Sequence, residues 1–291
     1  MEIGVLSRPS FIRLIFALTV AASLLTACSM PRLAYQQADW LLINEIDNYL
    51  DLRDGQREQL ERVFETQLSR HRVEQLPAIA QALEEAHARA QRGLAAEDVR
   101  WSLLRGRELL ESSAALLLPS VAATLADLDA EQREHLAGYL GEQIDEYAER
   151  YAGASSDDEQ LERATQRTVR RIERWTGTLS EEQIALVHDV SRSMPDVVPH
   201  WISYTRSRRS ELLALLESGA KAPVIEELLR KRWLLHNAMP ERLAHIRTQR
   251  IEARIAMIAR IDRSLDSMQR EHLIDRLQDL AKDTRSLMRE T

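Results

Sequence analysis

Apolar residues recur every three or four positions along most of this chain. Series with that spacing are Leu60, Val63, Phe64 and Leu68; Leu136, Leu140, Ile144, Tyr147 and Tyr151; and Ile251, Ile255 and Ile258. Because an α-helix has 3.6 residues per turn, this spacing places one apolar stripe on each helix, as in helices that pack against one another. Few stretches alternate as strands would. The pattern predicts an all-α protein.

The composition agrees with helices throughout. The chain has only nine glycines and eight prolines in 291 residues, and its commonest residues, Leu, Ala, Glu, Arg and Gln, are strong helix formers. Breaks are expected near Gly55, Gly93, residues 153–158, Gly177, residues 194–199, residues 219–223 and Pro240. We therefore predict a multi-helix bundle of eight to ten amphipathic helices.

The amino terminus has the order of a signal peptide. Arg8 and Arg13 precede a mostly apolar run over residues 14–25, and the small residues Thr26 and Ala27 follow. The run is shorter than the roughly 20 residues of a membrane-spanning helix. Residues 1–27 are expected to be removed, and no later stretch is expected to be long and apolar enough to be a transmembrane candidate.

Leu25, Thr26, Ala27 and Cys28 resemble the lipobox of bacterial lipoproteins, and Cys28 is the only cysteine. The resemblance implies thioether diacylation of Cys28, cleavage before it and a further amide-linked acyl chain such as palmitate. Several acyl chains anchor a protein far more firmly than one. Ser29, a residue other than Asp, implies the periplasmic face of the outer membrane. The alternative is a free thiol after an ordinary signal peptide.

A Leu-x-x-x-Gln pattern occurs four times and predicts four helix starts. Asp129, Ser180 and Asp266 can cap a helix while the glutamine three residues later reaches back to the cap's amide, which closes a capping box. The first copy departs, because Arg53 cannot accept a hydrogen bond; Asp51 or Asp54 is expected to serve instead. The glutamines of the four copies are Gln56, Gln132, Gln183 and Gln269.

This pattern is similar to the LTxxQ motif of the Spy and CpxP family of periplasmic chaperones and stress regulators. Those proteins carry two motifs in a dimeric cradle of helices that holds unfolded clients. Here there are four copies with Asp or Ser in place of Thr, in a chain about twice as long. The resemblance implies a binding or chaperone-like module.

A wider resemblance, to an uncharacterised family of proteobacterial lipoproteins, covers essentially all of the chain after residue 27. It rests on residues 28–35, 38–42, 49–52 and 72–77 and on the four helix starts, and it implies no activity. The spacing of the copies also suggests two related halves. The expected organisation is a removed signal peptide at 1–27, a lipidated N-terminus and first helix at 28–50, and helical halves at 51–153 and 154–291.

Residues that could support catalysis are few. Glu84 and His87 form one E-x-x-H pair, but a di-iron bundle needs a second, and His135 and His272 fit solvated or capping positions better than a metal site. No phosphate loop, zinc motif or nucleophile elbow occurs in the sequence. We therefore expect no metal, no cofactor and no enzymatic activity, although a hydrolase or metalloenzyme assembled from distant residues stays open.

Two basic and aromatic clusters remain, at residues 167–175 and 230–233, with Arg206, Arg208 and Arg209 between them. They could bind phosphate, acidic glycan or anionic lipid, but pairing with the abundant Glu and Asp of the same chain is preferred. Trp40, Trp101 and Trp201 are expected to pack in cores or helix seams, with headgroup contact by Trp40 as an alternative.

The negative net charge, −7 for the whole chain, argues against a nucleic-acid partner. The expected role is a lipid-anchored, non-catalytic binding or chaperone-like module of the cell envelope. An envelope scaffold or assembly factor is the alternative. The membrane, reached through lipid on Cys28, is the expected partner, together with a protein client or envelope component; the sequence leaves the oligomeric state undetermined.

Overall fold

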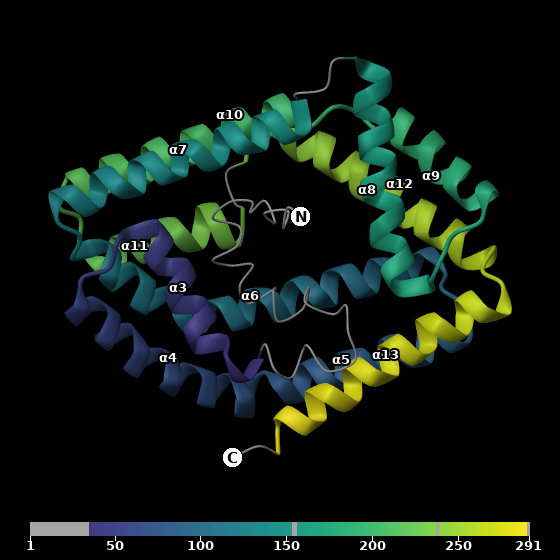
Figure 1. Cartoon of the computed structure of the whole chain (residues 1–291), viewed down its shortest axis with the longest axis horizontal. Helices are drawn as coiled ribbons and strands as arrows, with labels where there is room; N and C mark the ends of the chain where they lie inside the picture. Colours follow the sequence, from purple (N-terminus) through teal and green to yellow (C-terminus); the bar gives the residue numbers. More distant parts are fainter. Residues whose placement is uncertain (1–34, 153–155, 237–238, 290–291) are drawn as a thin grey trace, which may run out of the picture.

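A computed structural model describes residues 35–152, 156–236 and 239–289 (Figure 1). The predicted signal peptide, the lipobox and Cys28 lie outside these residues. The described part contains eleven α-helices, one short π-helix and no strand. The elements are α3 (Ala38–Leu50), α4 (Asp54–Glu74), α5 (Leu76–Gln91), α6 (Ala96–Ala126), α7 (Ala130–Ala152), α8 (Asp157–Thr176), α9 (Glu181–Ser193), α10 (Val198–Glu217), α11 (Ala222–Leu229), η1 (Arg230–Leu234), α12 (Glu241–Arg263) and α13 (Ser267–Leu287). The all-α prediction is confirmed, and the predicted count of eight to ten helices was too low.

The two prolines Pro77 and Pro119 show why the helix count was hard to predict. Pro77 lies in the first turn of α5, where its missing N–H has no intrahelical partner to lose, and a single residue, Gln75, separates α5 from α4. Pro119 instead lies inside α6, which continues past it for a total of 31 residues. The same residue type therefore begins one helix and leaves another unbroken.

The helices form a flattened ring (Figure 1). α7 and α10 run side by side along one edge, and α5, α6 and α13 lie along the opposite edge; α3, α4 and α11 fill one end, and α8, α9 and α12 close the other. Across residue 153, α5 packs on α13, α11 on α6, and α10 on α7. Helices of the two predicted halves are thus neighbours around the ring.

The main core fills the end of the ring that contains α3, α4 and α11. Tyr49, Phe64, Leu136 and Leu212 are almost completely buried there, and burial of each side chain of this size contributes about 1.5–3 kcal/mol. A smaller cluster around Val187 joins α9 to α12. Between these cores, the faces of α5, α6, α8, α12 and α13 surround a cavity.

α6 has the length and the apolar composition of a membrane-spanning helix, contrary to the sequence-based expectation for the chain after residue 27. Of its most apolar 18-residue window, 39% is buried. Core helices pass the same test, and α6 packs against α4, α11 and α12. The expectation was wrong because few charges interrupt the second half of α6, which stays helical through Pro119.

A candidate apolar binding cavity

The cavity has a volume of about 700 Å³ and is lined by residues of α4, α5, α6, α8, α12 and α13. That volume lies within the range of about 300–1,000 Å³ typical of ligand sites. A space of this size, with mostly aliphatic walls, therefore has the character of a binding site.

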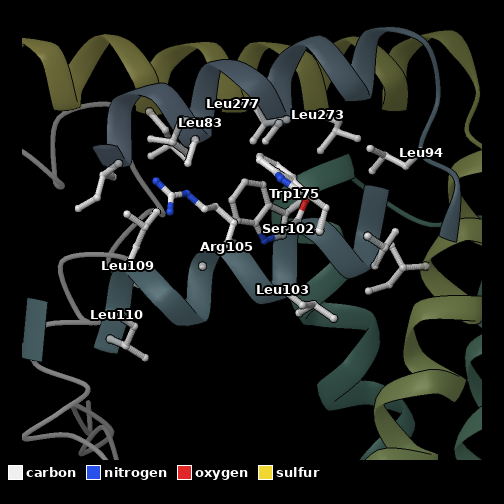
Figure 2. Close-up of a pocket in the computed structure, with 18 of the residues that line it drawn as sticks. Leu83, Leu94, Ser102, Leu103, Arg105, Leu109, Leu110, Trp175, Leu273 and Leu277 are labelled. Carbon is white, nitrogen blue, oxygen red and sulfur yellow. The ribbon is translucent and has the colours of Figure 1, made fainter. Parts of the chain in front are cut away.

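Leucine stripes on three helices build the walls. Leu273, Leu277 and Leu280 follow one another at four and three residues on α13, and Leu83 faces them from α5. Figure 2 shows the labelled leucines of α5 and α13 pointing toward α6, with Trp175 of α8 beside them. Leu103 of α6 also lines the cavity, yet it remains 48% exposed. The apolar stripe of α6 is therefore only partly covered.

Three neutral polar side chains, Tyr35, His71 and Ser113, line one end of the cavity. The Tyr35 hydroxyl lies 3.0 Å from Nδ1 of His71, and Nε2 of His71 lies 3.1 Å from the Ser113 hydroxyl. Burial lowers the pKa of His71 to about 4 and is the main cause that raises the pKa of Tyr35 to about 12. Both groups are therefore uncharged at neutral pH, which suits an apolar site.

The end formed by α8 and α12 carries two cations, Arg171 and Arg254. Neither makes a hydrogen bond or an ion pair with any residue that the structure describes. The pKa of Arg254 is lowered first by burial and then by the positive charges of Arg250 and Arg171. The two guanidiniums therefore lie close enough to repel each other, and both side chains are exposed.

The other charges around the cavity are already paired. Arg105 donates to Glu108 over 3.2 Å. Asp262, whose side chain is 4% exposed, forms an ion pair with Arg270 at 2.6 Å and accepts a hydrogen bond from the Leu94 amide at 2.8 Å. Asp283 lines the cavity from the last turns of α13 and also has a partner. Arg171 and Arg254 are thus the exception among the charged groups that line the cavity.

The repeated glutamines lie at helix starts and do not line the cavity. Asp129, Ser180 and Asp266 accept hydrogen bonds from the amides of the glutamines three residues later, at 2.9, 3.3 and 2.8 Å. In return, Gln132, Gln183 and Gln269 accept bonds from the three cap amides at 3.3, 2.9 and 3.1 Å. The three motifs therefore act as capping boxes.

The first copy differs from the expectation. Gln56 accepts a hydrogen bond from the Arg53 amide at 3.0 Å, but no side chain caps α4, so neither Asp51 nor Asp54 serves as its cap. Asp51 instead adopts a left-handed conformation with φ of 47° after α3. Arg53 pairs with Glu131 of the second copy at 2.6 Å and with Asp129 at 3.2 Å.

Tertiary structure brings the four copies together in two pairs. The side-chain amides of Gln56 and Gln132 bond each other at 3.2 and 2.7 Å, and those of Gln183 and Gln269 do so at 3.0 and 2.9 Å. Nε2 of Gln269 also donates to the Thr178 carbonyl at 2.6 Å. These glutamines connect helix starts that are far apart in sequence. The positions of the four motifs along the sequence did not predict which copies would lie together.

The remaining candidates for metal chemistry are separated. Glu84 accepts a hydrogen bond from Nε of Arg285 at 2.7 Å, and His135 lies 3.0 Å from the Asn48 carbonyl through Nε2. His272 lies beside Gly177. Among the residues that the structure describes, no group of three or more His, Cys, Asp or Glu side chains could hold a metal ion.

All three cations of the second basic cluster pair within the chain. Arg230 bonds Glu226 at 2.6 Å, Lys231 bonds Glu227 at 2.9 Å, and Arg232 bonds Glu211 at 2.7 Å. In the segment between the clusters, Arg206 lies 3.5 Å from Asp145 and Arg209 donates to the Ala137 carbonyl at 2.7 Å.

Arg208 is 2% exposed and lies among the rings of Trp201, Tyr204 and Trp233, at 5.4, 4.7 and 5.0 Å. It donates to the Arg232 carbonyl at 3.1 Å, and burial lowers its pKa to about 10. Trp201 and Trp101 are partly buried, and Trp101 lies under Arg89 at 4.2 Å. Trp40, expected in a core or seam, is 59% exposed, because the buried face of α3 is formed by Leu42, Ile43 and Ile46.

Residues 48–243 match a family of unknown function, DUF6279. This match covers more than half of the chain, which therefore belongs to that family. No curated protein and no solved structure matches the chain. The matched segment runs from the end of α3 to the start of α12, so the α13 wall of the cavity lies beyond it.

Proposed function

We propose that this protein is a non-catalytic binding protein that holds an elongated apolar ligand between α5, α6 and α13. The observation that carries this proposal is the cavity of about 700 Å³ with its leucine-lined walls. Apolar cavities of even about 150 Å³ stay dry and take up apolar molecules. A ligand that fills the larger space would add dispersion contacts to Leu83, Leu273 and Leu277, which line it.

We also propose that the protein is anchored by lipid on Cys28 at the periplasmic face of the outer membrane. The sequence of residues 25–28 after an apolar run supports this location. The exposed Trp40, near the start of α3, is compatible with it, because an indole suits the interface between lipid and water. Replacement of Cys28 by serine should move the protein from the membrane fraction to the soluble fraction.

Two glycines allow a matched test of ligand binding. Gly106 lines the cavity from the middle of α6, and Gly138 lies in the middle of α7 away from it. A Cβ atom placed on either glycine meets no atom within 4 Å. Phenylalanine also has a higher helix propensity than the glycine that it replaces at either position. Gly106→Phe should therefore occupy part of the cavity without unfolding α6, and Gly138→Phe is its control.

The test is a fluorescence titration of the full chain with N-phenylnaphthylamine, an apolar dye that brightens when it leaves water. We expect saturable binding to the wild type and to Gly138→Phe, and about tenfold weaker binding to Gly106→Phe, since roughly 1.4 kcal/mol of contacts would be lost. Thermal unfolding checks that all three proteins are folded. Absence of saturable binding to the wild type, or equal binding by both variants, would contradict the proposal.

A further inference from the structure

Two arginines that line the same end of the cavity, Arg171 and Arg254, have exposed side chains and no counter-charge among the described residues. Guanidiniums bind carboxylates and phosphates readily. The positive charges that act on Arg254 are those of Arg250 and Arg171. Arg250 is itself bonded to the Pro195 carbonyl at 2.7 Å. This end of the cavity therefore attracts an anion.

Nearby carboxylates are engaged elsewhere. Asp262, on the same helix as Arg254, is bound by Arg270. Glu252, two residues before Arg254, pairs with Arg100 at 2.5 Å. Asp283 is ten residues beyond Leu273 on α13, about 15 Å along the helix axis. Of the carboxylates in the described ranges, none is therefore paired with Arg171 or Arg254 at the positive end of the cavity.

The length of the cavity matches an acyl chain. Its lining extends along α13 from Leu273 to Leu287, which at 1.5 Å per residue is about 21 Å. One leaflet of a bilayer holds acyl chains of about 15 Å, half the thickness of the hydrocarbon core. The leucine-lined part can therefore take one extended acyl chain, with room for a headgroup at the α8–α12 end.

We propose that the ligand is an anionic amphiphile with one long acyl chain, whose carboxylate or phosphate binds Arg171 and Arg254. This inference rests on the proposed function and adds the class of ligand. Planar guanidiniums bind carboxylate and phosphate oxygens through paired, charge-assisted hydrogen bonds. Two arginines from two helices would hold the headgroup at one end, while the chain extends past Leu277 toward His71. A neutral ligand of the same length would leave both cations without a counter-charge.

The experiment compares three amphiphiles that differ at the headgroup. The full chain with bound dye is titrated at neutral pH with palmitate, with the lysophosphatidic acid that has one palmitoyl chain, and with hexadecanol, and the displacement of the dye is measured. Inorganic phosphate serves as the headgroup alone. The test variant is the double substitution Arg171→Gln and Arg254→Gln. Its control is Arg174→Gln and Arg260→Gln, on exposed positions of the same two helices that do not line the cavity.

We expect palmitate and lysophosphatidic acid to displace the dye from the wild type and the control at about tenfold lower concentration than hexadecanol, because one charge-assisted contact supplies roughly that factor. The test variant should lose this preference and still bind hexadecanol. Equal displacement by all three amphiphiles in every protein would overturn the anionic headgroup and leave the proposed function standing. Failure of the dye to bind at all would remove the proposed function itself.

Two further outcomes would also overturn this inference. Binding of inorganic phosphate that depends on Arg171 and Arg254, without binding of either long-chain anion, would indicate a simple anion site. Binding of palmitate to a Cys28→Ser variant but not to the membrane-extracted wild type would indicate that the protein's own acyl chains occupy the cavity. Equal binding of palmitate by those two proteins supports a separate ligand.

Discussion

Gln183 and Gln269 exchange two hydrogen bonds through their side-chain amides, of 3.0 and 2.9 Å, although 86 residues separate them. Each glutamine also accepts a bond from the cap amide of its own helix. One side chain therefore fixes both where a helix begins and which other helix start lies beside it. Gln56 and Gln132 repeat the arrangement at the other end of the ring.

Loss of either glutamine of the pair should destabilise the fold. Gln183→Ala removes the acceptor of one Gln269 side-chain N–H, whose other bond goes to the Thr178 carbonyl, and a buried donor left without its partner costs about 1–3 kcal/mol. The exposed Gln166, which bonds Glu162 on its own helix at 2.7 Å, provides the control, and Gln166→Ala should cost less than about 0.5 kcal/mol. Urea unfolding of Gln183→Ala, of Gln269→Ala and of the double variant that carries both substitutions gives the coupling energy between the two glutamines. Additive effects would contradict a direct interaction.

The buried ion pair of Asp262 and Arg270 holds the turn before α13 against α5 and α6. Arg270 also donates to the Ala90 carbonyl at 3.2 Å. Asp262→Ala should lower the free energy of unfolding by about 3–5 kcal/mol, because it leaves a largely buried guanidinium without its counter-charge. Asp279→Ala breaks an exposed pair with Lys282 and should cost at most about 1 kcal/mol. Similar unfolding midpoints for the two variants would be inconsistent with this account.

His71 should make the protein less stable in mild acid. Burial lowers its pKa from 6.5 to about 4, so between these values the unfolded chain binds more protons than the folded one. The stabilisation is complete above pH 6.5 and is lost as the pH falls through 4. The full shift corresponds to about 3 kcal/mol.

The variant His71→Gln isolates this contribution from those of other titrating groups. Its free energy of unfolding should change less between pH 7 and pH 4.5 than that of the wild type, by about 2–3 kcal/mol. Urea titrations at the two pH values measure the difference. An identical change in the two proteins would show that His71 already takes up a proton in the folded state.

The anchoring of the protein has a direct chemical test. If Cys28 is the processed N-terminus, mass spectrometry of the protein extracted from membranes should find a chain that begins at Cys28 and carries acyl groups. A chain that retains residues 1–27, or one that begins with an unmodified Cys28, would refute lipid anchoring.

The local part of the fold could be predicted from the sequence, since helices and their starts depend on nearby residues. The spacing of Leu136, Leu140 and Ile144 predicted an amphipathic helix, and the Ser180–Gln183 pattern marked a helix start. The contact between Gln183 and Gln269 could not be predicted, because it depends on how α9 and α13 meet in space. Trp40 was wrongly expected to be buried for the same reason, since the face of α3 that is covered depends on its neighbours.

The cavity was also outside the reach of sequence reasoning. The leucines of α13 follow the same spacing as those of a filled core, and only the packed structure shows a space in front of them. Arg171 belonged to a cluster that the sequence singled out, but Arg254 did not. A signal for Arg254 existed in the spacing of Arg247, Arg250 and Arg254, which places three cations on one face of α12.

A second relationship recurs between the two ends of the ring. Arg57 pairs with Asp47 of the preceding helix, and Arg270 pairs with Asp262 of the helix before it. In both cases the arginine follows a motif glutamine, and the aspartate also accepts a bond from a turn amide, that of Leu52 or Leu94. Such parallels are expected if residues 51–153 and 154–291 arose by duplication, which remains a hypothesis.

The central claim, that the cavity holds an amphiphile, is tested most directly by native mass spectrometry of the protein extracted from membranes in mild detergent. The account predicts one non-covalently bound amphiphile per chain in the wild type and in Gly138→Phe, and its loss in Gly106→Phe. Wild-type protein that carries no bound molecule, or a Gly106→Phe variant that retains the same one, would contradict it.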